Sequence, residues 1–150
     1  MQLYLLRHGD AEIGLPDDAR QLTALGRQQI IKIASTHQQH ISHIELVLSS
    51  PLHRALQSTD LFMSHTGLNC RRQAVDFLSP NTPVSEVERQ LQYFDIKSLL
   101  MVGHLPLLEN WIEYLSDDAS VTMATASLAS LTMDYAYKGT ATLNWIHYVD

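Results

Sequence analysis

The chain has 150 residues, of which 45% are hydrophobic and 17% charged, and its formal net charge is −6. This length and apolar content fit one packed domain that buries roughly 70% of its unfolded surface, and they exclude a disordered chain. The negative net charge argues against a nucleic-acid partner. The single cysteine, Cys70, excludes an intramolecular disulfide framework.

The apolar segments are too short for membrane insertion. No stretch approaches the roughly 18 apolar residues of a membrane-spanning helix, and the run at residues 3–6 is too short for the core of a signal peptide. We therefore expect one cytoplasmic domain that comprises residues 1–150 and has no membrane partner. A single small domain also predicts a monomer.

Strand and helix signals alternate along the chain. Strands are predicted at residues 2–6, 44–49, 71–75 and 98–102, and helices at residues 23–38, 51–64, 84–93 and 106–115. Thr23 is the expected N-cap of the first helix, and Gly26 slightly lowers the helix propensity of its first turn. Residues 127–133 and 140–148 predict a C-terminal hairpin. The pattern indicates an α/β three-layer sandwich, with a mainly parallel central sheet, an antiparallel edge and helices on both faces.

Positive charge is concentrated in the N-terminal half. Residues 1–75 hold seven lysines and arginines against six acidic residues, whereas residues 76–150 hold three against ten. We therefore expect arginines of the first half to hold any anionic ligand.

Three predicted strands lead into cationic or ionisable residues, namely Arg7-His8, Arg54 and His104. Ligands bind outside the carboxyl ends of parallel strands in open α/β sheets, so we expect these side chains to meet at one edge. The planar fork of arginine matches phosphate oxygens, and helix N-termini near Pro51 and Pro106 would add N–H donors. The cluster predicts a site for a phosphoryl group.

The residue types in this cluster suggest different catalytic roles. A neutral His8, held in a tight loop before Gly9, can attack phosphorus and form a covalent phosphohistidine. Its other ring nitrogen must then keep its proton, which a backbone carbonyl can bind. Arg7, Arg54 and a protonated His104 are expected to stabilise charge on the transferred oxygens. Because the arginines supply positive charge, we expect no metal and no cofactor.

Four segments resemble motifs of the histidine phosphatase superfamily, whose members are phosphoglycerate mutase-like. They are Leu6-Arg7-His8-Gly9, Leu22-Thr23-Ala24-Leu25-Gly26, residues 49–58 and Val102-Gly103-His104. Within the superfamily, the chain most resembles the SixA-type phosphohistidine phosphatases at residues 1–11, 103–107 and 125–132. The resemblance implies a hydrolase of two-component signalling. Its implied partner is the phosphotransfer (HPt) domain of a hybrid sensor kinase, which carries phosphohistidine.

A departure from the larger family members narrows the expected substrate. Those members carry an insertion with a catalytic Glu after the third strand, whereas residues 75–80 here lead directly into a helix. Ester hydrolysis expels an alkoxide and benefits from a general acid, whereas phosphohistidine expels imidazole, a better leaving group. We therefore expect cleavage of P–N rather than P–O bonds, unless Asp10, Glu12 or Asp17 serves as the acid. The alternatives are a small-molecule phosphomonoesterase or pyrophosphatase, and a non-catalytic phosphoprotein-binding module.

The remaining polar residues suggest local roles. Gly9, Asp17 and Arg20 are candidate loop or substrate contacts, and Asp17 is expected to pair with Arg20.

His37, His40 and His43 follow one another at three-residue steps, which we interpret as a solvated surface run rather than a metal site. His147 has no evident partner in the sequence.

Overall fold

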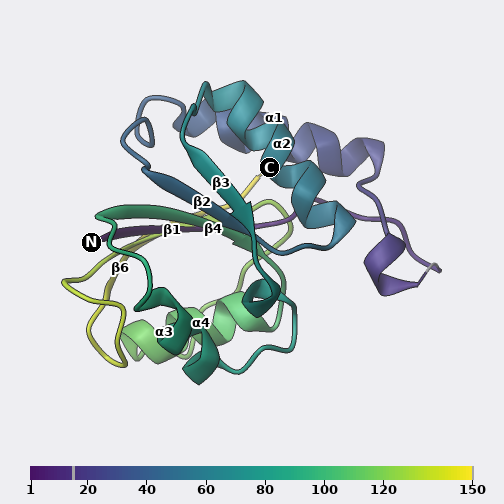
Figure 1. Cartoon of the computed structure of the whole chain (residues 1–150). Coiled ribbons are helices and arrows are strands. Elements are labelled where there is room, and N and C mark those ends of the chain that lie inside the picture. The colour runs from purple at the N-terminus through teal and green to yellow at the C-terminus, as the bar shows by residue number, and fades with distance from the viewer. Residues whose placement is uncertain (15, 150) are drawn as a thin grey trace.

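The computed structural model describes residues 1–14 and 16–149, and six strands among them form one sheet in the order β3-β2-β4-β1-β5-β6 (Figure 1). The strands are β1 (Gln2–Arg7), β2 (Leu46–Ser49), β3 (Arg71–Ala74), β4 (Ser98–Gly103), β5 (Leu128–Thr132) and β6 (Thr142–His147). The first four are parallel, while β5 is antiparallel to both β1 and β6. The predicted hairpin thus forms the predicted antiparallel edge.

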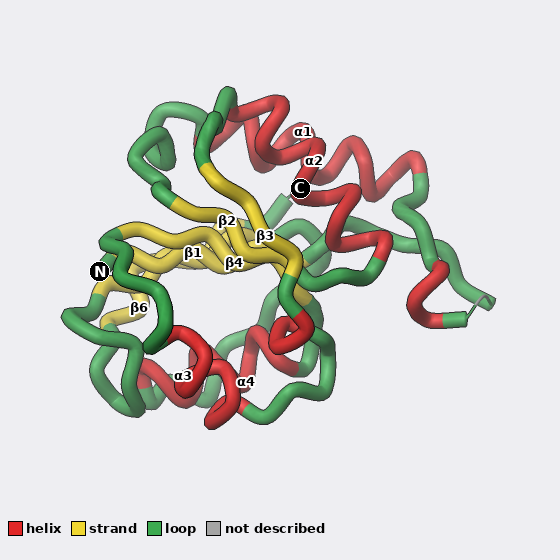
Figure 2. The backbone as a smooth tube through the Cα atoms, viewed as in Figure 1, coloured by secondary structure: helices red, strands yellow, loops and turns green. Residues whose placement is uncertain are grey.

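Helices of the described chain cover both faces of this sheet. They are α1 (Ala24–His37), α2 (His53–Thr66), α3 (Val84–Leu91) and α4 (Leu107–Ser116). Figure 2 shows α1 and α2 on one face and α3 and α4 on the other, which confirms the three-layer sandwich. Helix α2 begins later than predicted because Leu52 keeps an extended backbone. No helix among the described residues is long and apolar enough to span a membrane.

Apolar side chains of the central strands pack on both faces of the sheet. In β1, Leu3 and Leu5 pack with Trp111 of α4, whereas Tyr4 and Leu6 pack with Phe62 of α2. Strands that are buried on both faces carry continuous apolar runs, which is why residues 2–6 and 98–102 could be recognised in the sequence.

The parallel register brings the ends of β1, β2 and β4 to one edge. Arg7 is level with Gly103, and Ser49 is level with Val102. The pairing continues one residue beyond the strands, because the His8 N–H donates to the Gly103 carbonyl over 3.1 Å. The residues that follow the three strands therefore start side by side.

The loop after β1 lies directly on the first turn of α1. A Cβ atom on Gly26 would lie 2.0 Å from the Asp10 carbonyl oxygen, and one on Gly9 would lie 2.5 Å from the Gly26 carbonyl oxygen. Thr23 caps α1 by accepting from the Gly26 N–H, and it donates to the Asp10 carboxylate over 2.7 Å. Gly26 is therefore a packing requirement, which an assessment of helix propensity alone did not reveal.

The prediction that His37, His40 and His43 all lie exposed on the surface is wrong for His37. His37 is only 1% exposed, its ring stacks on Trp145 of β6, and its Nε2 lies 2.7 Å from Nδ1 of His147. His40 and His43 are exposed, as predicted. His37 is buried because β6, which is distant in the sequence, covers the end of α1.

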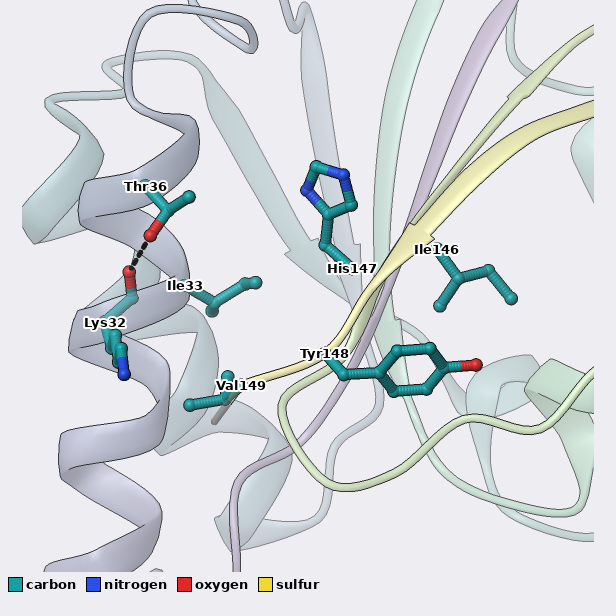
Figure 3. Close-up of a pocket in the computed structure, with 7 residues that line it drawn as sticks. All are labelled: Lys32, Ile33, Thr36, Ile146, His147, Tyr148 and Val149. Carbon is teal, nitrogen blue, oxygen red and sulfur yellow. Dashed lines mark hydrogen bonds between the residues drawn. The ribbon is translucent and has the colours of Figure 1, made fainter.

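A cavity of about 330 Å³ opens beside this contact, between α1 and the end of β6 (Figure 3). It is lined by Lys32, Ile33, Thr36, Ile146, His147, Tyr148 and Val149. Val149, which lies beyond the end of β6, points toward α1 in this view, whereas Ile146 of β6 points away from it.

Replacing Gly26 with Ala should destabilise the fold by about 1–3 kcal/mol, because the added methyl collides with rigid backbone. Urea denaturation would measure this loss. Leu25→Ala is the control, since Leu25 is 59% exposed in the same helical turn and should change stability by less than about 0.5 kcal/mol. An unchanged midpoint for Gly26→Ala would contradict the packing role.

Burial, together with the charges of His147 and His40, lowers the pKa of His37 from 6.5 to about 4. Between these pH values the unfolded chain binds a proton at this residue and the folded chain does not, so stability falls as the pH falls. Urea midpoints measured from pH 7 to pH 4 should decline less steeply for His37→Gln than for the unmodified protein. The exposed His43→Gln variant should keep the original slope, and equal slopes for all three proteins would refute the assignment.

Candidate active site

His8, Arg54 and His104 lie together where the central strands end. His8 follows β1, Arg54 lies in the first turn of α2, and His104 follows β4. The two imidazole rings have centroids 5.0 Å apart, and Arg54 Nε donates to His8 Nε2 over 3.4 Å. These side chains are 6%, 3% and 1% exposed, respectively. The structure thus brings these residues together, as the strand pattern predicted.

The backbone selects one tautomer of His8. Its Nδ1 lies 2.7 Å from the carbonyl oxygen of Gly9. A carbonyl only accepts hydrogen bonds, so Nδ1 carries the proton and Nε2 keeps a lone pair. Burial lowers the pKa of His8 to about 4, and the charges of Arg54, Arg7 and Arg20 act in the same direction against the opposing Gly9 carbonyl. His8 is therefore neutral at pH 7.

His104 differs from its predicted state. Burial, followed by the charges of His8 and Arg54, lowers its pKa to about 3, so the ring is neutral in the free site rather than protonated. Its Nε2 lies 2.7 Å from Ser50 Oγ, while its buried Nδ1 has no hydrogen-bond partner among the described residues. Buried polar atoms are nearly always paired, so Nδ1 is available to a ligand.

Arg7 reaches the site from the end of β1. Its Nη1 donates to the carbonyl oxygen of Met123 over 2.8 Å, and its buried Nε lacks a partner in the described chain. Burial lowers the pKa of Arg7, and the Glu109 carboxylate opposes that shift. The guanidinium thus remains a cation with an unpaired donor.

The loop after β1 contacts the site through Asp17. Arg54 Nη1 donates to the Asp17 carbonyl over 2.6 Å, and its Nη2 lies 3.2 Å from the carboxylate. Arg20 also bonds this carboxylate, which is the predicted loop pair. Slight burial raises the pKa of Asp17, but the hydrogen bonds and charges of Arg54 and Arg20 outweigh it and hold the pKa below its usual value. Asp17 is therefore ionised at pH 7.

The two other candidate acids have structural partners. The Asp10 carboxylate accepts from Thr23 Oγ1, and Glu12 Oε1 accepts from the Gln21 N–H. Neither contact involves His8. Among residues 1–14 and 16–149, no group of three or more His, Cys, Asp or Glu side chains is arranged to hold a metal ion.

Several supporting contacts were missed in the sequence. Ser58 of α2 accepts from the Gly9 N–H over 3.1 Å, and Gln57 accepts from the Leu22 N–H over 2.8 Å. These residues lie in the quoted segment 49–58, so their position in the motif was the available signal. Nothing in the sequence indicated that the Met123 carbonyl would bind Arg7, because any residue type supplies a backbone carbonyl.

The arrangement suits displacement at an anionic phosphorus centre. One neutral imidazole presents a lone pair, and a second imidazole has an unpaired nitrogen. The buried guanidinium of Arg54 and the half-buried guanidinium of Arg7 supply positive charge. Such donors stabilise negative charge better in a buried site than in water.

Comparisons with known proteins agree with this chemistry. Residues 3–74 match the model of the histidine phosphatase superfamily (branch 1). The chain is 31% identical to phosphohistidine phosphatase SixA of Escherichia coli K12, over 97% of this chain and 92% of that protein. It also matches the structure of the protein histidine phosphatase SixA complexed with tungstate, with a TM-score of 0.90, 29% identity and coverage of 99% and 97%.

A more distant match shows the fold alone. Phosphoserine phosphatase of Entamoeba histolytica superposes with a TM-score of 0.72 at 15% identity, over 99% of this chain and 98% of that one. The motif match and the full-length similarity to SixA together lead to one conclusion. The chain belongs to the histidine phosphatase superfamily.

Proposed function

We propose that this protein is a phosphohistidine phosphatase that hydrolyses P–N bonds through a covalent phosphohistidine on His8. The observation that carries the proposal is the His8 tautomer, because the Gly9 carbonyl leaves Nε2 unprotonated beside Arg54 and His104. The full-length similarity to SixA supports the same substrate class.

The proposed reaction has two displacements. His8 Nε2 attacks phosphorus, so a new N–P bond forms while the substrate P–N bond breaks and its electron pair returns to the departing imidazole. That ring leaves as neutral imidazole when its other nitrogen is protonated. Water then attacks the phosphoryl group on His8, which releases inorganic phosphate and restores neutral His8. Arg7 and Arg54 offset the phosphoryl charge in both steps.

The surrounding carboxylates favour P–N over P–O cleavage. Asp17 is ionised and cannot donate a proton at pH 7, while Asp10 and Glu12 bond to the loop itself. An ester benefits from an enzyme acid that protonates its leaving oxygen, whereas a phosphohistidine that is protonated on its other ring nitrogen leaves as neutral imidazole without such an acid. The chain between β3 and α3 adds only a short 3-10 helix, Asp76–Leu78, and supplies no inserted subdomain. This geometry does not favour the phosphomonoesterase or pyrophosphatase alternative.

The proposed substrate partner is the HPt domain of a hybrid sensor kinase. Asp17, which contacts Arg54, has a side chain that is 61% exposed, so accessible surface for a protein substrate adjoins the buried site. The presence of a neutral nucleophile alongside both arginines also favours catalysis over the non-catalytic binding module.

Replacing His8 with Ala should abolish turnover and covalent labelling, because it removes the Nε2 lone pair that the Gly9 carbonyl leaves unprotonated beside Arg54. Mixing the enzyme with ³²P-labelled phosphotransfer domain should give an acid-labile, base-stable label on the unmodified protein. His65→Ala, at an exposed site, should label normally. Retained turnover in His8→Ala would exclude the covalent mechanism.

Phosphate esters should be hydrolysed at least about 100-fold more slowly than a phosphohistidine protein, since a positioned general acid typically contributes 10²–10⁴-fold. Steady-state kcat/KM values for a phosphorylated phosphotransfer domain and a panel of alkyl phosphates would measure the ratio. Asp17→Asn should not lower the ester rates selectively, because an ionised Asp17 donates no proton. Comparable rates for both substrate classes would favour the phosphomonoesterase alternative.

A further inference from the structure

We propose that Glu109 is a positioning residue for Arg7 and that it acts through the backbone of Met123. The inference rests on the proposed function, since it takes Arg7 to bind the phosphoryl group. Glu109 lies in the first turn of α4, and Met123 lies in the irregular segment that leads from α4 to β5.

Both polar backbone atoms of Met123 are used, in two directions. Its N–H donates to Glu109 Oε2 over 2.7 Å, and its carbonyl oxygen accepts from Arg7 Nη1 over 2.8 Å. The Met123 residue is only 1% exposed. One buried residue therefore connects a carboxylate on α4 to the guanidinium at the end of β1.

The segment around Met123 has few other anchors on this side. The Ala126 N–H donates to the His8 carbonyl over 3.0 Å, and the Arg7 N–H donates to the Ser127 carbonyl over 3.1 Å, so the end near β5 is attached to β1. Upstream, Tyr148 holds the Thr122 carbonyl from the surface over 2.6 Å. The Met123 side chain packs in the core with Trp111, and Glu109 is the side chain that binds the Met123 backbone N–H. We infer that this hydrogen bond sets where the Met123 carbonyl points.

Because Glu109 contacts Arg7 only through the Met123 backbone, the charge of Arg7 remains available to bind a phosphoryl group. Among the described residues, no ion pair within 4.0 Å joins Glu109 to Arg7. A direct, bidentate pair would occupy the donors that a phosphoryl group needs. With Met123 between them, the carboxylate orients the guanidinium while Nε stays unpaired.

The sign of the expected effect separates positioning from simple electrostatics. Removing an anion near an oxyanion site strengthens oxyanion binding if charge alone matters. If Glu109 positions Arg7, Glu109→Ala weakens binding even though a negative charge is lost. Glu109→Gln loses the same charge but keeps an oxygen that accepts from Met123, so it should restore binding.

The test measures the dissociation constant of tungstate, an oxyanion, by calorimetry with the full chain. Glu109→Ala should weaken binding about tenfold, equivalent to about 1.4 kcal/mol. Glu109→Gln should stay within about twofold of the unmodified protein, or bind more tightly. Glu113→Ala, an exposed position on the same helix, should not change the constant. In a protein that already carries Arg7→Ala, adding Glu109→Ala should cause no further loss of tungstate affinity.

Unchanged or tighter binding by Glu109→Ala, with weaker binding by Arg7→Ala, would overturn the positioning role and leave the proposed function intact. If Glu109→Ala does not fold by circular dichroism, Glu109→Asp replaces it. Its shorter side chain withdraws the carboxylate from Met123, so it should bind tungstate less tightly than Glu109→Gln, and the reverse order would overturn the inference. A protein that binds tungstate but does not dephosphorylate phosphohistidine would contradict the proposed function, while the Glu109 comparison would still be decided.

Discussion

The hydrogen bond from His8 Nδ1 to the Gly9 carbonyl, 2.7 Å long, determines which ring nitrogen can react. This bond requires a tight loop after β1, and the loop keeps its shape because Gly9 and Gly26 allow two backbones to touch. Ser58 and Thr23 then hold the loop from α2 and α1. The chemistry of one imidazole thus depends on close packing between a loop and two helices.

Each arginine of the site is oriented by a backbone carbonyl. Arg54 donates to Asp17 over 2.6 Å, and Arg7 donates to Met123 over 2.8 Å. A carbonyl acceptor orients a guanidinium without neutralising it, so the positive charge of Arg7 stays available to a phosphoryl group, whereas Arg54 also forms an ion pair with the Asp17 carboxylate. Burial, together with these charges, lowers the pKa values of both imidazoles and keeps them neutral in the free site. A phosphoryl dianion would reverse that electrostatic environment on binding.

Local patterns predicted much of the fold and the composition of the site. Apolar runs marked the central strands because those strands are buried on both faces. The ends of β1 and β4 and the start of α2 carried Arg7-His8, His104 and Arg54, and parallel pairing places such ends at one edge. The expected carbonyl partner of His8 also followed from chemistry, because a nucleophilic imidazole needs its second nitrogen protonated.

Tertiary contacts decided what these patterns could not. His37 is buried by Trp145 and His147 of a distant strand, and Gly26 is required by the Asp10 carbonyl. His104 is neutral because burial and neighbouring cations outweigh its intrinsic basicity. The sequence by itself determined the sheet, its helices and the identity of the reactive side chains, since each depends on local periodicity or residue chemistry. Only the tertiary structure decided their protonation and orientation, because both depend on atoms supplied by segments far apart in the chain.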